Sequence, residues 1–207
     1  MCMAEITAIT PQVKDKERCN VYVDGSFYCG MRLDTLIAAR LKVGDEIEPL
    51  WLDEIQSESE KAQALDKAMT HLSASMKTEK QMRDFLKKKG YVDAVCDYVL
   101  DKLRGYGFVD DAEYCAQYVA FSGKNKGARL IACELKKRGV ADSVVENALC
   151  DLTGESDAAK QILRKYMKNR EFTRENLSKA YRHLMSRGFD YDTAKEALDS
   201  LRCESED

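Results

Sequence analysis

The chain has 207 residues, 44% of them hydrophobic and 33% charged, and its 36 acidic and 33 basic side chains leave a net charge of −3. This is the composition of a globular protein large enough for several small domains, and its slight acidity argues against tight binding to naked nucleic acid by charge alone. Without an apolar run of about 18 residues, or a basic and then apolar leader, membrane insertion and export are not expected, which favours a cytoplasmic protein.

The first 30 residues show the alternation of apolar and polar side chains that is typical of β-strands. It occurs in the segments EITAITPQ and RCNVYVDGSFYCG. Asp24-Gly25 lies inside the second segment and favours a two-residue hairpin, because a type I′ turn needs positive φ at both central positions. We therefore predict a hairpin tip at this pair, with Val21 and Val23 on one face of the sheet and Tyr22 on the other.

The next segment completes a compact head. A short helix is predicted around Asp34–Arg40, followed by a turn and a brief closing strand within LKVGDEIEPL. The acidic run Asp53–Glu60 then either forms a junction or begins the first long helix. We expect a small β-rich head at residues 1–55. Because the only two prolines, Pro11 and Pro49, lie within it, the rest of the chain is free to be helical.

Three segments of the remaining chain share one pattern at a constant spacing. They read LKKKGYVDAVCDYVL, LKKRGVADSVVENAL and LMSRGFDYDTAKEAL, and they begin 49 residues apart at Leu86, Leu135 and Leu184. Such a register marks a repeat architecture, in which each unit packs mainly against its neighbours. We predict that the three leucines are equally buried. We also predict that a glycine ends a helix in each segment, namely Gly90, Gly139 and Gly188.

Each repeat divides into three predicted helices. In the first repeat, the first helix has an apolar stripe at Leu65, Met69 and Leu72. The sequence TEKQ, which starts at Thr78, has the form of a capping box before the second helix. A third helix begins near Asp93, where an acidic side chain can cap it. Its predicted buried stripe is Val95, Cys96, Val99, Leu100 and Leu103.

The predicted fold class is therefore mainly α. It consists of three tandem three-helix repeats with a 49-residue period, which form an elongated, curved body behind the small β-rich N-terminal head. We expect nine helices between residues 61 and 203. The predicted repeats are residues 56–107, 108–153 and 154–203, and an acidic tail follows at residues 204–207.

The sequence offers no convincing catalytic or metal site. The eight cysteines contain no C-x-x-C pair and only two histidines could join them, so no zinc cluster is expected. Reduced thiols are the better interpretation for a cytoplasmic chain. The segments GYGF and FSGKNKG contain glycines but lack the spacing and the preceding strand of nucleotide-binding loops. We therefore expect no catalytic residue, no metal and no cofactor.

Charge separates the head from the repeats. Residues 1–60 hold 12 acidic against 6 basic side chains, a net charge of −6, which leaves 24 against 27, or +3, for the remainder. Many bases lie near helix ends, where they oppose the helix macrodipole, so a purely structural role is one interpretation. The other is a shallow basic stripe that faces a polyanion. The candidate binding residues of this basic stripe are Lys87, Lys88, Lys89, Lys124, Lys126, Arg129, Lys136, Lys137 and Arg138. Further bases in the third repeat are Arg164, Lys165, Lys168 and Arg170.

The second repeat carries the segments that are most specific to one family. These are FVDDAEYCAQYV, from Phe108, and KGARLIACELKKRGV, from Lys126. Supporting segments are LSASMKTEKQMRDFLKKKGY and, in the head, ITAITPQVKDKERCNVYVDGSFYCGM. In their order and period, these segments resemble the RecX regulatory proteins of bacteria over nearly the whole chain.

The resemblance implies a negative regulator of RecA, the recombinase that forms filaments on single-stranded DNA. Such a protein lies in the filament groove and limits filament extension, strand exchange, ATP hydrolysis and the co-protease activity that triggers the SOS response. The implied partner is the RecA filament on single-stranded DNA, with weak direct nucleic-acid contact, no membrane and a monomeric state favoured. Two alternatives stay open, a helix-turn-helix-like DNA-binding protein and a helical-repeat scaffold for another protein.

Overall fold

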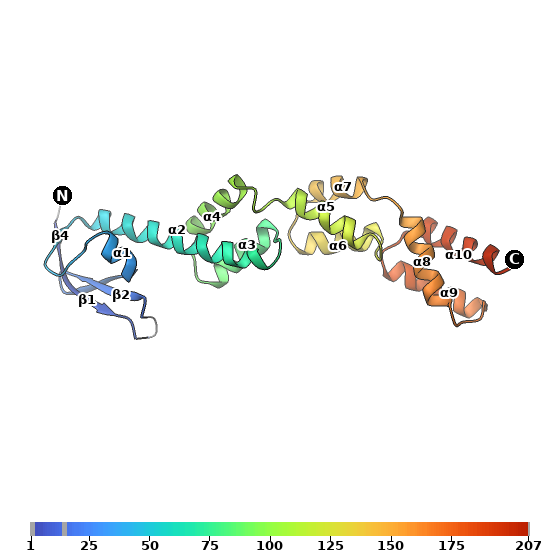
Figure 1. Ribbon diagram of the computed structural model, residues 1–207, viewed down its shortest axis with the longest axis horizontal. Helices are drawn as coiled ribbons and strands as arrows, with labels where there is room; N and C mark the ends of the chain where they lie inside the picture. Colours follow the sequence, from blue (N-terminus) through green and yellow to red (C-terminus); the bar gives the residue numbers. More distant parts are fainter. Residues whose placement is uncertain (1–2, 14–15, 207) are drawn as a thin grey trace. The chain divides into compact units, whose positions relative to one another are not determined.

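The computed structural model describes residues 3–13 and 16–206, which form four strands and ten helices (Figure 1). They belong to two compact units, Met1–Ser75 with Phe85–Leu103, and Met76–Asp84 with Arg104–Asp207. The strands are β1 (Ala4–Pro11), β2 (Arg18–Val23), β3 (Ser26–Arg32) and β4 (Glu46–Ile47). The helices are α1 (Leu33–Ala38), α2 (Pro49–Ala74), α3 (Glu79–Lys88), α4 (Asp93–Gly105), α5 (Asp111–Ser122), α6 (Ala128–Lys137), α7 (Asp142–Cys150), α8 (Glu155–Met167), α9 (Arg174–Ser186) and α10 (Tyr191–Glu206).

The head is an antiparallel sheet in the order β3-β2-β1-β4. Asp24 (φ 48°) and Gly25 (φ 79°) form the tip of the β2–β3 hairpin, so the predicted turn is confirmed. Val21 and Val23 lie on the buried face, at 0% and 7% exposed, whereas Tyr22 is only half-buried. The buried face forms one core with side chains of α1 and α2.

Helix α2 continues without a break from the head into the first repeat. It begins at Pro49, a residue favoured at the first helical position, and runs for 26 residues. The acidic run Asp53–Glu60 is therefore the start of a long helix, and residue 55, where the head was expected to end, lies inside it. In the repeat portion the buried positions are Ala64 and Ala68, whereas Met69 is 37% exposed. The predicted apolar stripe was wrong at Met69, because small alanines, and not the large side chains, occupy the buried line of this helix.

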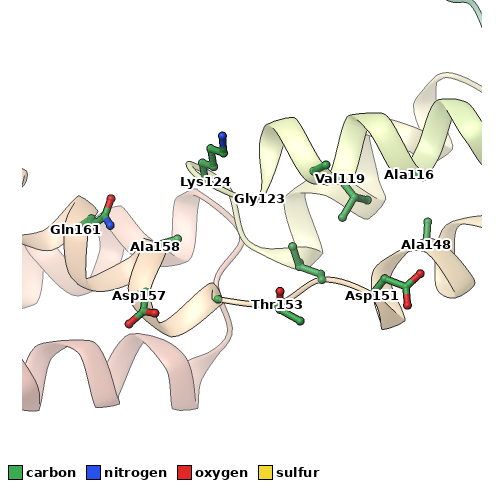
Figure 2. Close-up of a pocket in the computed structure, with 13 residues that line it drawn as sticks. Ala116, Val119, Gly123, Lys124, Ala148, Asp151, Thr153, Asp157, Ala158 and Gln161 are labelled. Carbon is green, nitrogen blue, oxygen red and sulfur yellow. The ribbon is translucent and has the colours of Figure 1, made fainter.

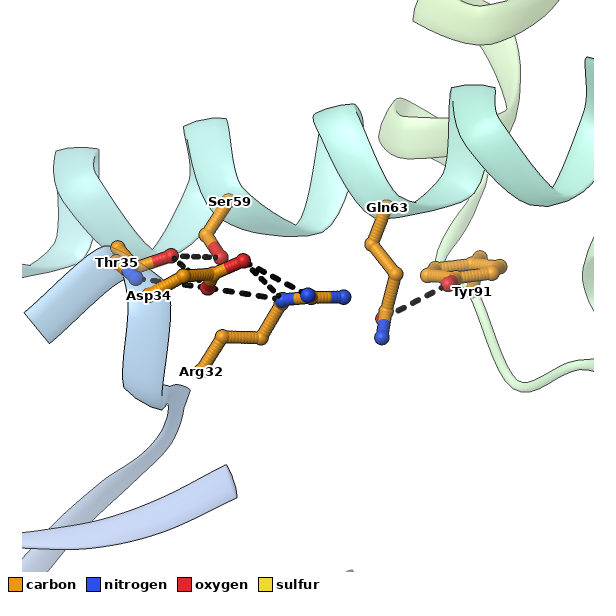
Figure 3. Close-up of polar contacts among 6 residues, drawn as sticks. All are labelled: Arg32, Asp34, Thr35, Ser59, Gln63 and Tyr91. Atoms are coloured by element: carbon orange, nitrogen blue, oxygen red, sulfur yellow. Dashed lines mark hydrogen bonds and ion pairs between the residues drawn. The ribbon is translucent and has the colours of Figure 1, made fainter. Parts of the chain in front are cut away.

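Polar contacts connect α2 to the elements on both sides of it (Figure 3). Arg32, at the end of β3, forms an ion pair with Asp34 (2.7 Å), and Thr35 of α1 shares a hydrogen bond with Ser59 of α2 (2.7 Å). Further along α2, the side-chain oxygen of Gln63 accepts a hydrogen bond from the Tyr91 hydroxyl (2.9 Å). The same helix therefore supports the head and the first repeat within the first unit.

The predicted repeat register is confirmed by burial and by backbone conformation. The leucines that start the pattern, Leu86, Leu135 and Leu184, are each 0% exposed. The glycines just beyond the ends of α3, α6 and α9 have positive φ, a conformation that L side chains adopt only with strain. These are Gly90 (91°), Gly139 (86°) and Gly188 (87°). The predicted stripe of α4 is also buried, at 4% exposed or less for every member.

The predicted capping box before α3 is present. Gln81 Oε1 accepts a hydrogen bond from the Thr78 amide (3.1 Å), and Thr78 Oγ1 accepts one from the Gln81 amide (3.2 Å). Thr78 is fully buried, and its hydroxyl also donates a hydrogen bond to the carbonyl of Arg138, next to Gly139 (2.7 Å). Within the second unit, the start of α3 is therefore tied to the turn that ends α6.

A contact of the same kind recurs 49 residues later. Gly127 occupies the position of Thr78, and its amide donates to the carbonyl of Arg187 (3.0 Å), which is the equivalent of Arg138. A Cβ atom on Gly127 would lie only 2.4 Å from the carbonyl oxygen of Gly188, so a larger residue would push the two backbones apart. The start of α6 therefore packs directly against the turn that ends α9.

Acidic side chains complete both of these contacts. Asp111, the first residue of α5, accepts a hydrogen bond from the Glu79 amide at the start of α3 (2.9 Å). Glu155, the first residue of α8, accepts one from the Ala128 amide at the start of α6 (2.8 Å). Carboxylates are favoured there because the first amides of a helix lack partners and carry partial positive charge. Each contact thus joins the second helix of one repeat to the first helix of the next.

Candidate functional site

Two residues of the basic stripe form equivalent ion pairs in the first two repeats. Lys87 lies 2.9 Å from Asp93, and Lys136 lies 3.0 Å from Asp142, so each pair bridges the glycine turn between two helices. The lysines and the aspartates are both 49 residues apart, a regularity that the sequence already displays and that the prediction did not use. These two lysines therefore have a local structural role, and a carboxylate partly neutralises each of them.

The neighbouring lysines are more available. Lys88 and Lys137, also 49 residues apart, are exposed and form no ion pair within the described part of the chain. Lys89 lies 5.6 Å from the ring centroid of Phe85, which in turn stacks on His71 (4.0 Å). Residues 87–89 belong to the first unit and the six other members of the basic stripe to the second. Lys88 in the first unit and Lys137 in the second are thus members of the basic stripe whose charge is not compensated by a carboxylate in the described residues.

Lys126 belongs to an internal polar network of the second repeat. Its Nζ atom lies 2.7 and 2.6 Å from the two carboxylate oxygens of Glu134, and Glu134 also accepts a hydrogen bond from the Tyr118 hydroxyl. Partial burial alone would raise the pKa of Glu134, but the hydrogen bonds from Lys126 and Tyr118 hold it below its ordinary value. The hydrogen bond with Glu134 raises the pKa of Lys126. Lys126 therefore stabilises the repeat, and because Glu134 neutralises its charge it is a weak contact for an anionic partner.

Arg138 lies against the same network. Its guanidinium carbon is 4.1 Å from the ring centroid of Tyr118, and its carbonyl oxygen accepts the hydrogen bond from Thr78. The Nη1 atom is buried and has no hydrogen-bond partner in residues 3–13 and 16–206. Arg138 therefore takes part in the contact between α3 and α6, and its guanidinium group is not fully available to bind an anion from solvent.

The last two members of the basic stripe lie near carboxylates. Lys124 lines a cleft of about 600 Å³ in the second unit, together with Asp151 and Asp157 and several small apolar residues (Figure 2). Hydrogen bonds from Thr193 hold the pKa of Asp190 below its ordinary value, and the nearby charge of Arg129 contributes to the same shift. These acids weaken the positive potential around both bases, so neither is a strong isolated contact for an anion.

The residues that the structure describes contain no group of three or more His, Cys, Asp or Glu side chains placed to hold a metal ion. Among the same residues, none of the helices has the length and apolar character needed to cross a membrane.

Four family models match the chain in consecutive order. They are the regulatory protein RecX N-terminal domain, at residues 4–48, and the first, second and third three-helix domains of RecX, at residues 64–103, 110–149 and 154–198. Each match to a three-helix domain contains one leucine and one glycine of the 49-residue register. The fold of the whole chain is therefore that of one known architecture.

Similar whole proteins support the same conclusion. The regulatory protein RecX of Bacillus licheniformis is 31% identical over 99% of this chain and 80% of its own length. That of Bacillus velezensis is 32% identical with the same coverage, and that of Clostridium botulinum is 29% identical over 95% of each chain. A crystal structure of regulatory protein RecX matches 95% of this chain and 99% of its own, with a TM-score of 0.68 and 28% identity. The chain belongs to the RecX family of regulatory proteins.

Proposed function

We propose that this protein is a negative regulator of the RecA recombinase. It binds the RecA filament on single-stranded DNA in the filament groove and limits filament extension, strand exchange, ATP hydrolysis and co-protease activity, and so moderates DNA repair and the SOS response in the cytoplasm. The observation that carries this proposal is the match of four RecX domains, in order, over residues 4–198. A repeat architecture suits a partner that offers a groove, because each repeat adds its own contact surface.

The exposed lysines of the basic stripe are the proposed contacts with the filament. Lys88 and Lys137 occupy the same position in two repeats and lack a local carboxylate, whereas Lys87 and Lys136 are paired with aspartates. Charges of this kind mainly set the association rate and the salt dependence of binding. We therefore expect the unpaired lysines to contribute more to filament binding than the paired ones.

The direct test measures RecA ATPase activity and strand exchange with increasing amounts of the protein over a range of salt concentrations. The wild type should inhibit both reactions. The K88Q/K137Q variant should inhibit less, with a flatter salt dependence, because two uncompensated charges are lost. The matched control is K87Q/K136Q, which removes the same charge from paired positions. Absence of inhibition by the wild type contradicts the proposed function, whereas equal inhibition by all three proteins contradicts only the role of the lysines.

The alternative of a helix-turn-helix DNA reader has little support from the exposed side chains. The helices that would enter a major groove are α4 and α7, the third helices of their repeats. The exposed surface of α4 carries Asp97 and Asp101, and that of α7 carries Glu146. Carboxylates on a recognition helix face a strongly negative groove, which disfavours this mode of binding.

A further inference from the structure

The third repeat carries a local excess of positive charge. Residues 160–187 hold nine Lys or Arg against two Asp or Glu, a net charge of +7, in a chain whose net charge is −3. The segment contains most of α8, the loop that follows it, and α9. One of its acids, Glu175, pairs with Lys179 (2.6 Å), and Lys160 pairs with Glu196 of α10 (3.2 Å). These two pairs leave most of the excess charge in place.

The uncompensated charge gathers where α8 turns into α9. We define the hairpin tip as Lys165, Lys168, Arg170, Phe172 and Arg174. All five residues are exposed, and the Phe172 side chain is 43% exposed although it is large and apolar. Within residues 3–13 and 16–206, none of the four bases forms an ion pair. The hairpin tip therefore combines an exposed aromatic ring with four cations that are not paired with a carboxylate in the described part of the chain.

One residue of the hairpin tip, Arg170, belongs to a stack of side chains between α8 and α9. The guanidinium carbon of Arg170 lies 3.7 Å from the ring centroid of Tyr166, and the same ring stacks with His183, at 4.6 Å between centroids and 21° between ring planes. Arg187 Nε donates a hydrogen bond to His183 Nε2 (3.2 Å), and its Nη1 donates to the carbonyl of Asn125 (3.2 Å). The stack connects α8 to α9, and it places the guanidinium of Arg170 against the Tyr166 ring.

The equivalent position in the second repeat shows why the third one stays positive. His183 corresponds to Glu134, 49 residues earlier, and Glu134 neutralises Lys126 there. Burial and the charges of Arg187 and Arg170 lower the pKa of His183, so its imidazole is neutral at pH 7 and can accept the hydrogen bond from Arg187. The third repeat thus has a neutral ring where the second has a carboxylate, and this ring does not neutralise the cations of the hairpin tip.

We infer that the hairpin tip is a contact site for single-stranded nucleic acid. Its four bases face the phosphates, and Phe172, with the outer face of Arg170, provides a surface on which a base stacks. Exposed aromatic rings among cations are the usual means of binding single strands without sequence preference. In a duplex the bases are already stacked on one another, so only the phosphate contacts would remain. The inference rests on the proposed function and deepens it, because it names the surface that touches the strand on which RecA assembles.

The test for the charges measures binding of a fluorescently labelled oligo-dT to the full-length protein by anisotropy, over a salt titration. The K168Q/R174Q variant removes two charges without touching the Tyr166 stack. Its affinity should fall about tenfold near physiological salt, and the slope of log K against log salt should become shallower by about 1.4, as expected for two lost phosphate contacts with a single strand. The control K16Q/K42Q removes the same charge from exposed positions of the head and should change the affinity by less than about twofold.

The test for stacking uses F172A, which leaves the charge unchanged. The affinity for oligo-dT should fall about fivefold or more, as expected when one base loses a stacking partner, while the salt slope stays constant. The affinity for a duplex of equal length should be unaffected. Because the hairpin tip is exposed, all variants should show the wild-type circular dichroism spectrum and melting curve.

Three results would overturn the inference. The first is an absence of wild-type binding to oligo-dT, and the second is an equal affinity of the wild type and K168Q/R174Q for oligo-dT. The third is a loss of duplex affinity in F172A that is as large as its loss of affinity for oligo-dT, or an equally large loss in F172A of the ability of poly-glutamate to compete for the protein. None of these measurements includes RecA. If the wild type binds oligo-dT through the hairpin tip but does not inhibit RecA, the proposed function fails and the inference stands. If it inhibits RecA and does not bind oligo-dT, only the inference fails.

Discussion

The second and third repeats have the same backbone register and different surface chemistry. Leu135 and Leu184 are equally buried, and Gly139 and Gly188 end their helices with nearly the same φ. At exposed and half-buried positions the repeats differ. Met185 stands at the position of Lys136, and the imidazole of His183 stands at the position of the Glu134 carboxylate. The core and the surface are thus encoded at different positions of the repeat, so the surface can change without disturbing the core.

The largest effect is expected at the glycine of the third repeat. A Cβ on Gly188 would lie 2.3 Å from the amide nitrogen of Leu130, in addition to the strain of φ near +87°. A Cβ on Gly90 would meet no heavy atom within 4 Å, so only the φ strain applies there. We expect G90A to cost about 1–2 kcal/mol of unfolding free energy. G188A adds overpacking and should cost about 2–5 kcal/mol.

Urea unfolding combined with native-state hydrogen exchange measures the two losses separately, because the two glycines belong to different compact units whose transitions need not coincide. Equal losses in the two variants would show that the close contact between α6 and the end of α9 contributes nothing to stability.

A somewhat smaller effect is expected at Thr78, which joins α3 to the second repeat through its side chain. T78V keeps the shape but removes the donor to the Arg138 carbonyl and the acceptor for the Gln81 amide. The loss should be about 1–3 kcal/mol, since a buried carbonyl is left without its partner and a helix loses its cap. T78S retains both hydrogen bonds and is the matched control. If T78V is as stable as T78S, the hydroxyl contributes nothing to this contact.

Acidification should distinguish the second repeat from the third. The pKa of His183 is lowered, so its contribution to stability is present above the ordinary histidine value of 6.5 and is lost as pH falls through the lower folded value. The pKa of Glu134 is also lowered, so its contribution is lost only below the ordinary value of 4.5. The third repeat should therefore lose stability first as pH falls.

Urea midpoints measured from pH 7.5 downward check this order in the wild type, H183Q and E134Q. H183Q should remove the part of the decline that starts near pH 6.5, and E134Q the part below pH 4.5. At pH 7, E134Q should cost about 1 kcal/mol, the scale of a hydrogen-bonded charge that is partly exposed. If both variants follow the wild-type profile, the two side chains do not titrate with folding.

The sequence predicts the framework of these repeats better than their surface. Glycines at positive φ, the capping box and the buried leucines follow from local rules, so the periodic pattern was sufficient to find them. The apolar stripe of α2 was wrong at Met69, because the packing partner of a helix is not visible in its own periodicity. The role of the basic stripe stays a prediction. The ion pairs of Lys87 and Lys136 and the network of Lys126 depend on which carboxylate lies nearby in space, and a list of basic residues does not contain that information.

The smallest effect is expected for the ion pair that the first two repeats have and the third lacks. Lys136 and Asp142 bridge a glycine turn, but both side chains are largely exposed, so water and salt weaken their attraction. A double-mutant cycle with K136Q and D142N should give a coupling energy of about 0.2–1 kcal/mol at low salt, and less than half of this at about 1 M salt. The same cycle on Lys87 and Asp93 should give the same value.

A larger coupling energy that persists at high salt would mean that the ion pair defines the turn. The third repeat has Met185 and Tyr191 at these positions, so it would then need a different contact to hold its helices together. One is available, because the ring of Tyr191 lies edge-on against Tyr181 at 6.0 Å. This ring contact links α9 to α10 without an ion pair.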